Sequence, residues 1–212
     1  MRAVVFDVGE TLIDESRLWA AWADWLGVPP FTFFVALGSV IGSGRDHREV
    51  FAVLGFDYER EHAARAAAGI VGGFGADDLY PDVRPCLDAL RADGYAIGVV
   101  GNQPVRAEGQ LRELALPVDL IATSAGWGVS KPAPAYFTRV AAAMGCATAD
   151  IVHVGDRVDN DVVPAAEAGM VSVFIRRGPW AFIQRGRPGV ERARIAIDSL
   201  AELPDALRSL GS

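Results

Sequence analysis

The chain contains almost no lysine. Of its 20 basic residues only one is a lysine, Lys131, and all the others are arginines. A lysine ammonium is a compact point charge on a flexible stem, whereas a guanidinium is a planar fork, so the two cations are not interchangeable. The single lysine reflects either drift in an arginine-rich composition or a need for an amine at that one position. The sequence context of Lys131 decides between these two interpretations.

Cysteine, excess positive charge and long apolar runs are also scarce. Cys86 and Cys146 show no paired spacing, which is typical of a reducing compartment and predicts a cytoplasmic protein without disulfides. The formal net charge of -7 argues against a general nucleic-acid or anionic-membrane surface, because both need a positive field. The longest apolar run, residues 31–41, is shorter than the roughly 20 residues that span a bilayer. We therefore expect no nucleic-acid partner and no membrane partner.

The hydrophobic content is ample, at 51% of 212 residues, and it is organised as alternating strand and helix patterns. Short β-branched runs alternate with helical periodicity from residue 80 onward, which predicts an α/β fold with a parallel sheet and right-handed crossovers. Residues 14–79 show helical periodicity and no strand pattern. We predict a core formed by residues 1–13 and 80–212, with residues 14–79 as a helical insertion. The expected strands are 3–6, 95–100, 120–123, 151–154, 171–175 and 195–197.

Acidic residues follow two of the predicted strands. Asp7 comes directly after the apolar run 3–6, and Asp156 and Asp161 follow the run 151–154. Asp7 could simply belong to a surface loop. The carboxyl ends of parallel strands meet at one edge of the sheet, however, and three carboxylates gathered there would repel one another without a divalent cation. An all-oxygen site suits Mg²⁺, so we predict a magnesium site at this edge.

Phosphate is the expected ligand opposite that cation. Lys131 and the backbone N–H groups of the Gly101-Asn102 turn would hold phosphate oxygens, since charged amines and backbone amides both donate to them. Asp7 could then attack phosphorus and form an aspartyl-phosphate. His153 lies inside a predicted strand, and we interpret it as a packed or hydrogen-bonded imidazole rather than a catalyst.

Two arginines lie outside this constellation. Arg176 and Arg177 follow the predicted strand 171–175, where they could steer an anionic substrate or simply offset nearby acids.

Four segments of the chain, taken together and in order, resemble the motifs of the haloacid dehalogenase-like hydrolase superfamily. The resemblance implies a Rossmann-like parallel-sheet core with helices on both faces and a helical cap inserted after the first strand. It also implies that Asp7 is the nucleophile and that Asp156 is a direct Mg²⁺ ligand. Asp161 would be a ligand or a water-mediated support, and the Gly9 carbonyl a further ligand. The matching segments are Phe6-Asp7-Val8-Gly9-Glu10-Thr11-Leu12, Val99-Val100-Gly101-Asn102, Ser130-Lys131-Pro132 and Val154-Gly155-Asp156-Arg157-Val158-Asp159-Asn160-Asp161.

The sequence departs from the family pattern at two positions. Gly9 stands where the family has its second acid, which protonates the leaving group and later activates water. General acid–base catalysis is typically worth about 10²–10⁴-fold, so its loss would slow turnover without removing the nucleophile. Gly101 stands where the family has a hydroxyl, which leaves Asn102 and backbone donors to hold phosphate. Glu10 is adjacent to Gly9 but is expected to point elsewhere.

Several activities remain open within the family. A phosphonate-cleaving member would need a lysine in the cap, and residues 14–79 contain none. A dehalogenase needs no Mg²⁺ and has no use for clustered carboxylates, so the acids favour phosphoryl chemistry. We therefore predict slow, Mg²⁺-dependent hydrolysis of a small phosphorylated metabolite. The alternatives are a catalytically weakened phosphate-binding or regulatory protein, and a hydrolase with other chemistry such as dehalogenation.

Overall fold

The computed structural model describes residues 1–210, and the chain divides into two compact units. One unit, called here the sheet unit, combines Met1–Asp14 with Gly75–Ser212, and the other, the helical unit, is Glu15–Phe74. The expected insertion, residues 14–79, is longer than this helical unit by Asp14 at its start and by five residues at its end. Residues 75–79 group with the sheet unit, because the Tyr80 N–H donates to the Leu12 carbonyl at 2.9 Å and Leu79 forms an antiparallel bridge with Ile13.

The sheet unit is built on six parallel strands, which confirms the predicted α/β core. Their order across the sheet is β3-β2-β1-β4-β5-β6. The order reverses between β1 and β4, and such a switch point opens a crevice at the carboxyl ends of the strands where α/β proteins bind ligands. The strands are β1 (Ala3–Phe6), β2 (Ala96–Gly101), β3 (Leu120–Thr123), β4 (Ile151–Gly155), β5 (Val171–Ile175) and β6 (Ile195–Ile197).

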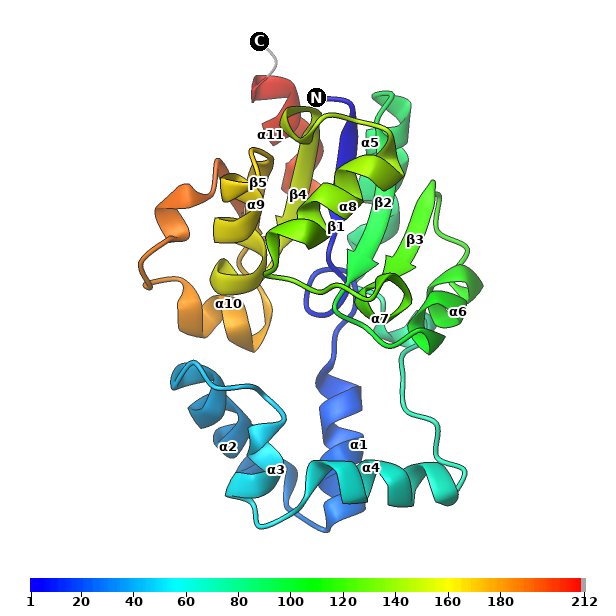
Figure 1. Cartoon of the computed structure of the whole chain (residues 1–212), viewed down its shortest axis with the longest axis vertical. Coiled ribbons are helices and arrows are strands. Elements are labelled where there is room, and N and C mark those ends of the chain that lie inside the picture. The colour runs from blue at the N-terminus through cyan, green and yellow to red at the C-terminus, as the bar shows by residue number, and fades with distance from the viewer. Residues whose placement is uncertain (211–212) are drawn as a thin grey trace. The chain divides into compact units, whose positions relative to one another are not determined.

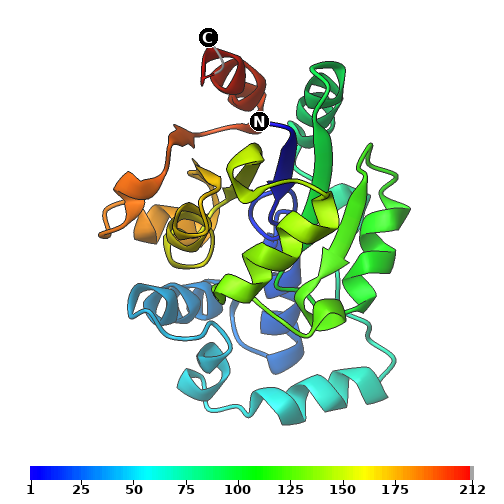
Figure 2. The same ribbon diagram turned by 45° about the horizontal axis from the view of Figure 1, so that its top comes forward.

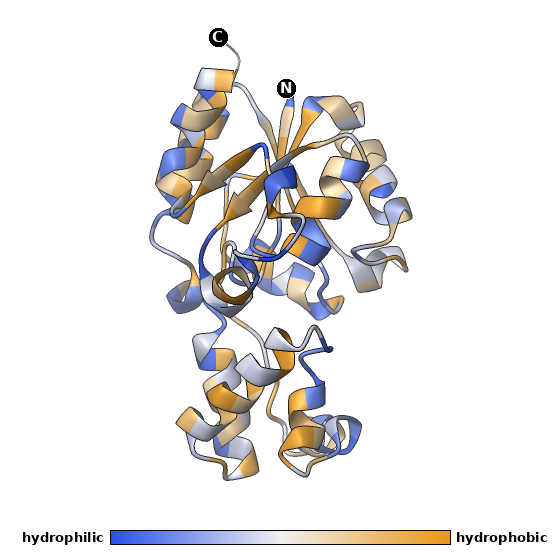
Figure 3. Ribbon diagram, turned by 90° about the vertical axis from the view of Figure 1, so that its left-hand side faces the viewer, coloured by the Kyte–Doolittle hydropathy of each residue, from blue (hydrophilic) through white to orange (hydrophobic). Residues whose placement is uncertain are grey.

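Helices cover both faces of this sheet (Figures 1 and 2). Tyr136, Phe137 and Val140 of α8 pack against β1, β2 and β4 on one face, and α5 and α11 lie on the other. The strands are among the most hydrophobic segments of the unit (Figure 3), as expected where a sheet is buried on both sides. The helices are α5 (Val83–Ala92), α6 (Arg106–Glu113), α7 (Ser124–Trp127), α8 (Pro134–Met144), α9 (Val163–Glu167), α10 (Gly178–Gln184) and α11 (Leu203–Leu210).

Two of these helices are short and carry little periodic signal in the sequence. In α7 a single turn forms because the Thr123 hydroxyl accepts the Gly126 N–H at 3.1 Å. The seven residues of α10 begin Gly178-Pro179 and bury Trp180, Ala181 and Gln184. So short an apolar pattern, preceded by Gly and Pro, resembles a turn more than a helix when only the sequence is read.

The helical unit has an aromatic interior. The rings of Trp22 and Phe51 meet edge to face at 4.9 Å, and the Arg65 guanidinium lies 4.1 Å from the centre of the Trp22 ring. Trp19 and Trp22 are buried, so they contribute to this interior. The unit consists of α1 (Ser16–Leu26), α2 (Pro30–Gly42), α3 (Glu49–Val53) and α4 (Tyr58–Ala67).

Among residues 1–210, no single helix is long and apolar enough to cross a bilayer. Helices α1 and α2 reach the required length and composition only as a pair, with a bend of 115° between them.

Arg176 and Arg177 pair with different acids in the sheet unit. The Arg177 guanidinium binds both oxygens of Asp82 at 2.9 and 3.0 Å, and Asp82 also accepts the Ser199 hydroxyl at 2.7 Å. Burial works to raise the pKa of Asp82, but the hydrogen bonds from Ser199 and Arg177 hold that pKa below its ordinary value. Arg176 forms a more exposed pair with Asp198 at 2.7 Å. Both arginines therefore offset nearby acids, one of the two roles expected for them.

The two pairs give a matched test of stability. We expect Asp82→Ala to lower the free energy of unfolding at pH 7 by about 1–3 kcal/mol, because partly buried donors lose their acceptor. Asp198→Ala, the exposed control, should cost about 0–1 kcal/mol. Because the folded-state pKa of Asp82 lies below the unfolded value, its contribution is complete above about pH 4 and is lost as the pH falls through the folded-state pKa. Urea unfolding at pH 7 and at pH 3 measures both effects; equal losses in the two variants would contradict this account.

Candidate active site

Lys131 lies between two buried carboxylates. Its ammonium nitrogen is 2.7 Å from Asp7 Oδ1 and 2.6 Å from Asp161 Oδ1, and its side chain is only 1% exposed. Burial would lower the pKa of Lys131, but Asp161 and Asp7 raise it above its ordinary value, so the amine is charged. The structure thus brings the one lysine of the chain to the acid that follows β1.

Asp156 completes a group of three acids at the carboxyl ends of β1 and β4. Asp7, Asp156 and Asp161 each offer a carboxylate oxygen, and these three oxygens lie within 4.8 Å of one another. Burial, reinforced by Asp161 and Asp7, raises the pKa of Asp156 well above its ordinary value. Its Oδ2 is buried and has no hydrogen-bond partner among residues 1–210. A carboxylate oxygen in that position and an all-oxygen donor set both fit a hard divalent cation such as Mg²⁺.

Both oxygens of Asp161 already bind groups of the protein. Oδ1 accepts from Lys131 and lies 3.1 Å from His153 Nε2, and Oδ2 accepts the Arg157 backbone N–H at 3.2 Å. Burial works to raise the pKa of Asp161, but Lys131 and His153 hold that pKa well below its ordinary value. Asp156 therefore has an oxygen without a partner among residues 1–210, whereas both oxygens of Asp161 are taken up by groups of the protein.

Gly155 makes room for this arrangement. A Cβ at Gly155 would lie 2.3 Å from Asp161 Cγ, which is too close for two carbon atoms that are not bonded to each other. A glycine at position 155 is thus required by Asp161, six residues further along the chain.

The Asn102 side chain binds the backbone of Lys131 through two hydrogen bonds. Its Oδ1 accepts the Lys131 N–H at 2.9 Å, and its Nδ2 donates to the Lys131 carbonyl at 2.9 Å. The carboxamide therefore fixes the backbone that carries the amine. Phosphate binding at the Gly101-Asn102 turn stays a prediction for the backbone N–H groups.

Glu10 anchors the loop that follows Asp7, a role that the sequence did not suggest. Its φ of 53° lies in the left-handed region, which non-glycine residues seldom occupy. Its Oε2 accepts the Tyr80 hydroxyl at 2.8 Å, and its side chain fills the space beside Gly178, where a Cβ would lie 2.4 Å from that oxygen. Gly9 therefore lies in a loop that Glu10 fixes through its contacts with Tyr80 and Gly178, and the Glu10 carboxylate points toward Tyr80. The only sign of this role in the sequence is the presence of an acidic residue, Glu10, directly after Gly9.

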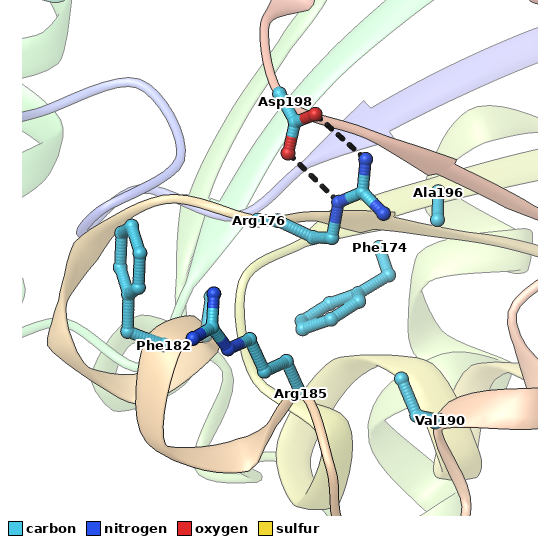
Figure 4. Close-up of a pocket in the computed structure, with 8 residues that line it drawn as sticks. Phe174, Arg176, Phe182, Arg185, Val190, Ala196 and Asp198 are labelled. Atoms are coloured by element: carbon cyan, nitrogen blue, oxygen red, sulfur yellow. Dashed lines mark hydrogen bonds and ion pairs between the residues drawn. The ribbon is translucent and has the colours of Figure 1, made fainter.

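A cavity of about 570 Å³ lies elsewhere in the sheet unit, between β5, β6 and α10 (Figure 4). Arg176 lines it, but the guanidinium makes two hydrogen bonds to Asp198, at 2.8 and 2.7 Å. The charge of Arg176 is therefore compensated by Asp198 within the protein, and Asp7, Asp156 and Asp161 do not line this cavity.

The chain is similar in sequence to phosphatases of known name. The chain is 36% identical over 134 residues to a glyceraldehyde 3-phosphate phosphatase from Methanopyrus kandleri. That match covers 62% of this chain and 57% of the relative, so the chain spans little more than half of that protein. A phosphoglycolate phosphatase from Cereibacter sphaeroides is 30% identical, with 99% of both proteins covered.

Solved structures resemble the chain over nearly its full length. A HAD phosphatase from Thermococcus onnurineus superimposes with a TM-score of 0.63 and 25% identity, covering 98% of both chains. An L-2-haloacid dehalogenase from Xanthobacter autotrophicus shares the fold at 17% identity, with a TM-score of 0.63 and 99% of both chains covered. A family model of haloacid dehalogenase-like hydrolases matches residues 1–169. The chain therefore belongs to the haloacid dehalogenase-like hydrolases.

Proposed function

We propose that this hydrolase is a Mg²⁺-dependent phosphatase of small phosphate monoesters. The observation that carries the proposal is the buried group of Asp7, Asp156 and Asp161 with the Lys131 ammonium beside it. A dehalogenation site has no need of three carboxylates within 4.8 Å of one another. The names of the relatives from Methanopyrus and Cereibacter, both phosphatases of small metabolites, support the same chemistry.

Asp7 is the proposed nucleophile. One of its oxygens attacks phosphorus, the bond from phosphorus to the ester oxygen breaks, and the product is an aspartyl-phosphate that water then hydrolyses. Lys131 Nζ, 2.7 Å from Asp7 Oδ1, is placed to donate to a phosphate oxygen at that carboxylate. Mg²⁺ held by Asp7, Asp156 and the Gly9 carbonyl would neutralise the negative charge that the phosphate brings to the acids.

The proposed activity is slow because Gly9 has no side chain to move protons. The leaving oxygen needs a proton and the hydrolytic water has to lose one, and Glu10 already accepts the Tyr80 hydroxyl. Both transfers therefore fall to water molecules in the site. The second candidate, a phosphate-binding protein with little turnover, is favoured by this same absence.

The substrate class follows from charge and from the relatives. A net charge of -7 disfavours nucleic acid, and the relatives' names point to phosphorylated metabolites such as glyceraldehyde 3-phosphate and phosphoglycolate. We propose a substrate of this size, with the helical unit Glu15–Phe74 serving as the cap that selects it.

Gly101 has a consequence that the motif alone would not predict. A Cβ at this position would lie 2.8 Å from Asp7 Oδ1 and 2.9 Å from Val8 Cγ2. The nucleophilic carboxylate therefore occupies the space that a hydroxyl-bearing side chain would need. Restoring the family's hydroxyl should displace Asp7 rather than improve phosphate binding.

The proposed nucleophile and the missing acid are tested together. Hydrolysis of a panel of small phosphate esters should require Mg²⁺ and stop on addition of EDTA. Asp7→Asn should abolish it, because the amide is a poor nucleophile. Gly9→Asp should raise kcat by about 10-fold or more, since general acid–base help is worth about 10²–10⁴-fold when well placed. If the parent hydrolyses no ester and Gly9→Asp gains nothing, the phosphate-binding alternative takes the place of the phosphatase.

Gly101 provides a second test, with Gly109 as its control. Gly101→Ala and Gly101→Ser should each lower kcat/KM by about 10–100-fold, because small displacements of a reacting group carry penalties of that size. Gly109 lies in α6 with no heavy atom within 4 Å of an added Cβ, so Gly109→Ala should leave kcat/KM unchanged. Steady-state kinetics on the four proteins decides the point. A serine variant that is faster than the parent would show that the missing hydroxyl is the limiting feature.

A further inference from the structure

His153 lies in β4, three residues before Asp156, and contacts the acid that holds Lys131. Its Nε2 is 3.1 Å from Asp161 Oδ1, the same oxygen that lies 2.6 Å from Lys131 Nζ. Lys131 Nζ is in turn 2.7 Å from Asp7 Oδ1. The four side chains form a buried series from the middle of β4 to the end of β1, and the first three are no more than 1% exposed.

The direction of the hydrogen bond between His153 and Asp161 is fixed by the charge of the carboxylate. An ionised carboxylate only accepts hydrogen bonds, so the hydrogen between His153 and Asp161 has to reside on Nε2. The other ring nitrogen, Nδ1, is buried and has no partner among the residues described. An imidazole kept for packing alone would need no such arrangement, since an apolar side chain could fill the space beside Phe137 without leaving a buried nitrogen unpaired.

Lys131 is shared between two carboxylates at nearly equal distances. An ammonium in this situation moves toward the carboxylate whose negative charge is less compensated. The His153 N–H binds the Asp161 oxygen that Lys131 also uses, so it reduces the pull of Asp161 on the amine. It also limits rotation of the Asp161 carboxylate about its own axis.

We propose that His153 is a positioning residue that keeps the Lys131 ammonium on Asp7. Its hydrogen bond to Asp161 balances the two carboxylates, so that the amine stays where a phosphate oxygen has to bind. Without that hydrogen bond, Asp161 draws the amine toward itself and away from Asp7. The catalytic consequence rests on the proposed phosphatase activity, whereas the placement of the amine does not.

The lysine content of the chain allows a direct test of the placement. Lys131 is the only lysine, so protein labelled with ¹⁵Nζ-lysine and carrying a lysine-free tag gives a single side-chain ammonium signal. We expect that signal to be visible in the parent, because a buried and paired ammonium exchanges its hydrogens slowly. His153→Gln places an amide N–H near the position of Nε2 and should keep the signal close to that of the parent. His153→Asn mimics Nδ1 instead, and it should shift the signal or remove it through fast exchange.

The glutamine and asparagine variants separate positioning from packing. Both are polar amides in the same buried strand, so a merely structural role would move their melting temperatures together and leave the lysine signal of the folded protein unchanged. Identical lysine signals in the parent and both variants would overturn the proposal. A second test needs only the parent protein. A long-range ¹H–¹⁵N spectrum of its histidines shows which ring nitrogen of His153 carries the hydrogen. Hydrogen on Nε2 of His153 supports the proposal, and an Nε2 without hydrogen overturns it even if the variants fail to fold.

Kinetics then measures what the placement contributes. We expect kcat/KM for a phosphate ester to fall about 10–100-fold in His153→Asn and to be largely restored in His153→Gln, which is about 1.4–2.7 kcal/mol at 1.36 kcal/mol per tenfold. The inhibition constant of inorganic phosphate should rise in the asparagine variant alone. A parent that hydrolyses no ester defeats the proposed function and leaves the spectroscopic result to stand by itself. Equal kinetics in the two variants, with an active parent, defeats the positioning role.

Discussion

The ammonium of Lys131, buried between Asp7 and Asp161, is the interaction on which the arrangement of the site depends. Three carboxylates lie within 4.8 Å of one another there, and burial strengthens the repulsion among them. Removing one partner of a buried ion pair typically costs about 3–5 kcal/mol, because the remaining charge is left uncompensated. One amine cannot balance three acids. Burial, with Asp161 and Asp7 close by, raises the pKa of Asp156 above its ordinary value. A divalent cation bound there would relieve the repulsion among the three acids.

The parallel sheet explains how residues far apart in the chain come to share this charge. Asp7 follows β1 and Asp156 follows β4, and these strands are neighbours at the point where the strand order reverses. Lys131 reaches the same place from the loop after α7, where the Asn102 carboxamide binds its backbone on both sides. Glycines make the approach possible, since a Cβ at Gly101 or Gly155 would overlap Asp7 or Asp161. The local backbone is thus shaped by the carboxylates it has to accommodate.

The fold was largely predictable because its signals are periodic. Buried parallel strands such as β1 and β4 read as short β-branched runs, and the alternation of strands with helices is typical of a single class of architecture. The helices α7 and α10 carry too little periodicity to be predicted, because one is a single turn and the other has seven residues beginning with Gly and Pro. The acids could be singled out by their residue type at the ends of strands, and Lys131 because it is the only lysine of the chain. The contacts of Asn102, Glu10 and His153 could not, since they depend on side chains meeting across elements 29, 70 and 8 residues apart.

The central claim, that Asp7 is a nucleophile beside a cation site, can be tested without knowing the substrate. Beryllofluoride mimics a phosphoryl group on a carboxylate, and its bound form is observed directly by ¹⁹F NMR. We predict bound signals in the parent when Mg²⁺ is present, and none without Mg²⁺ or in Asp7→Asn. Bound signals that persist in Asp7→Asn, or a parent that binds no beryllofluoride with Mg²⁺ present, would contradict the account.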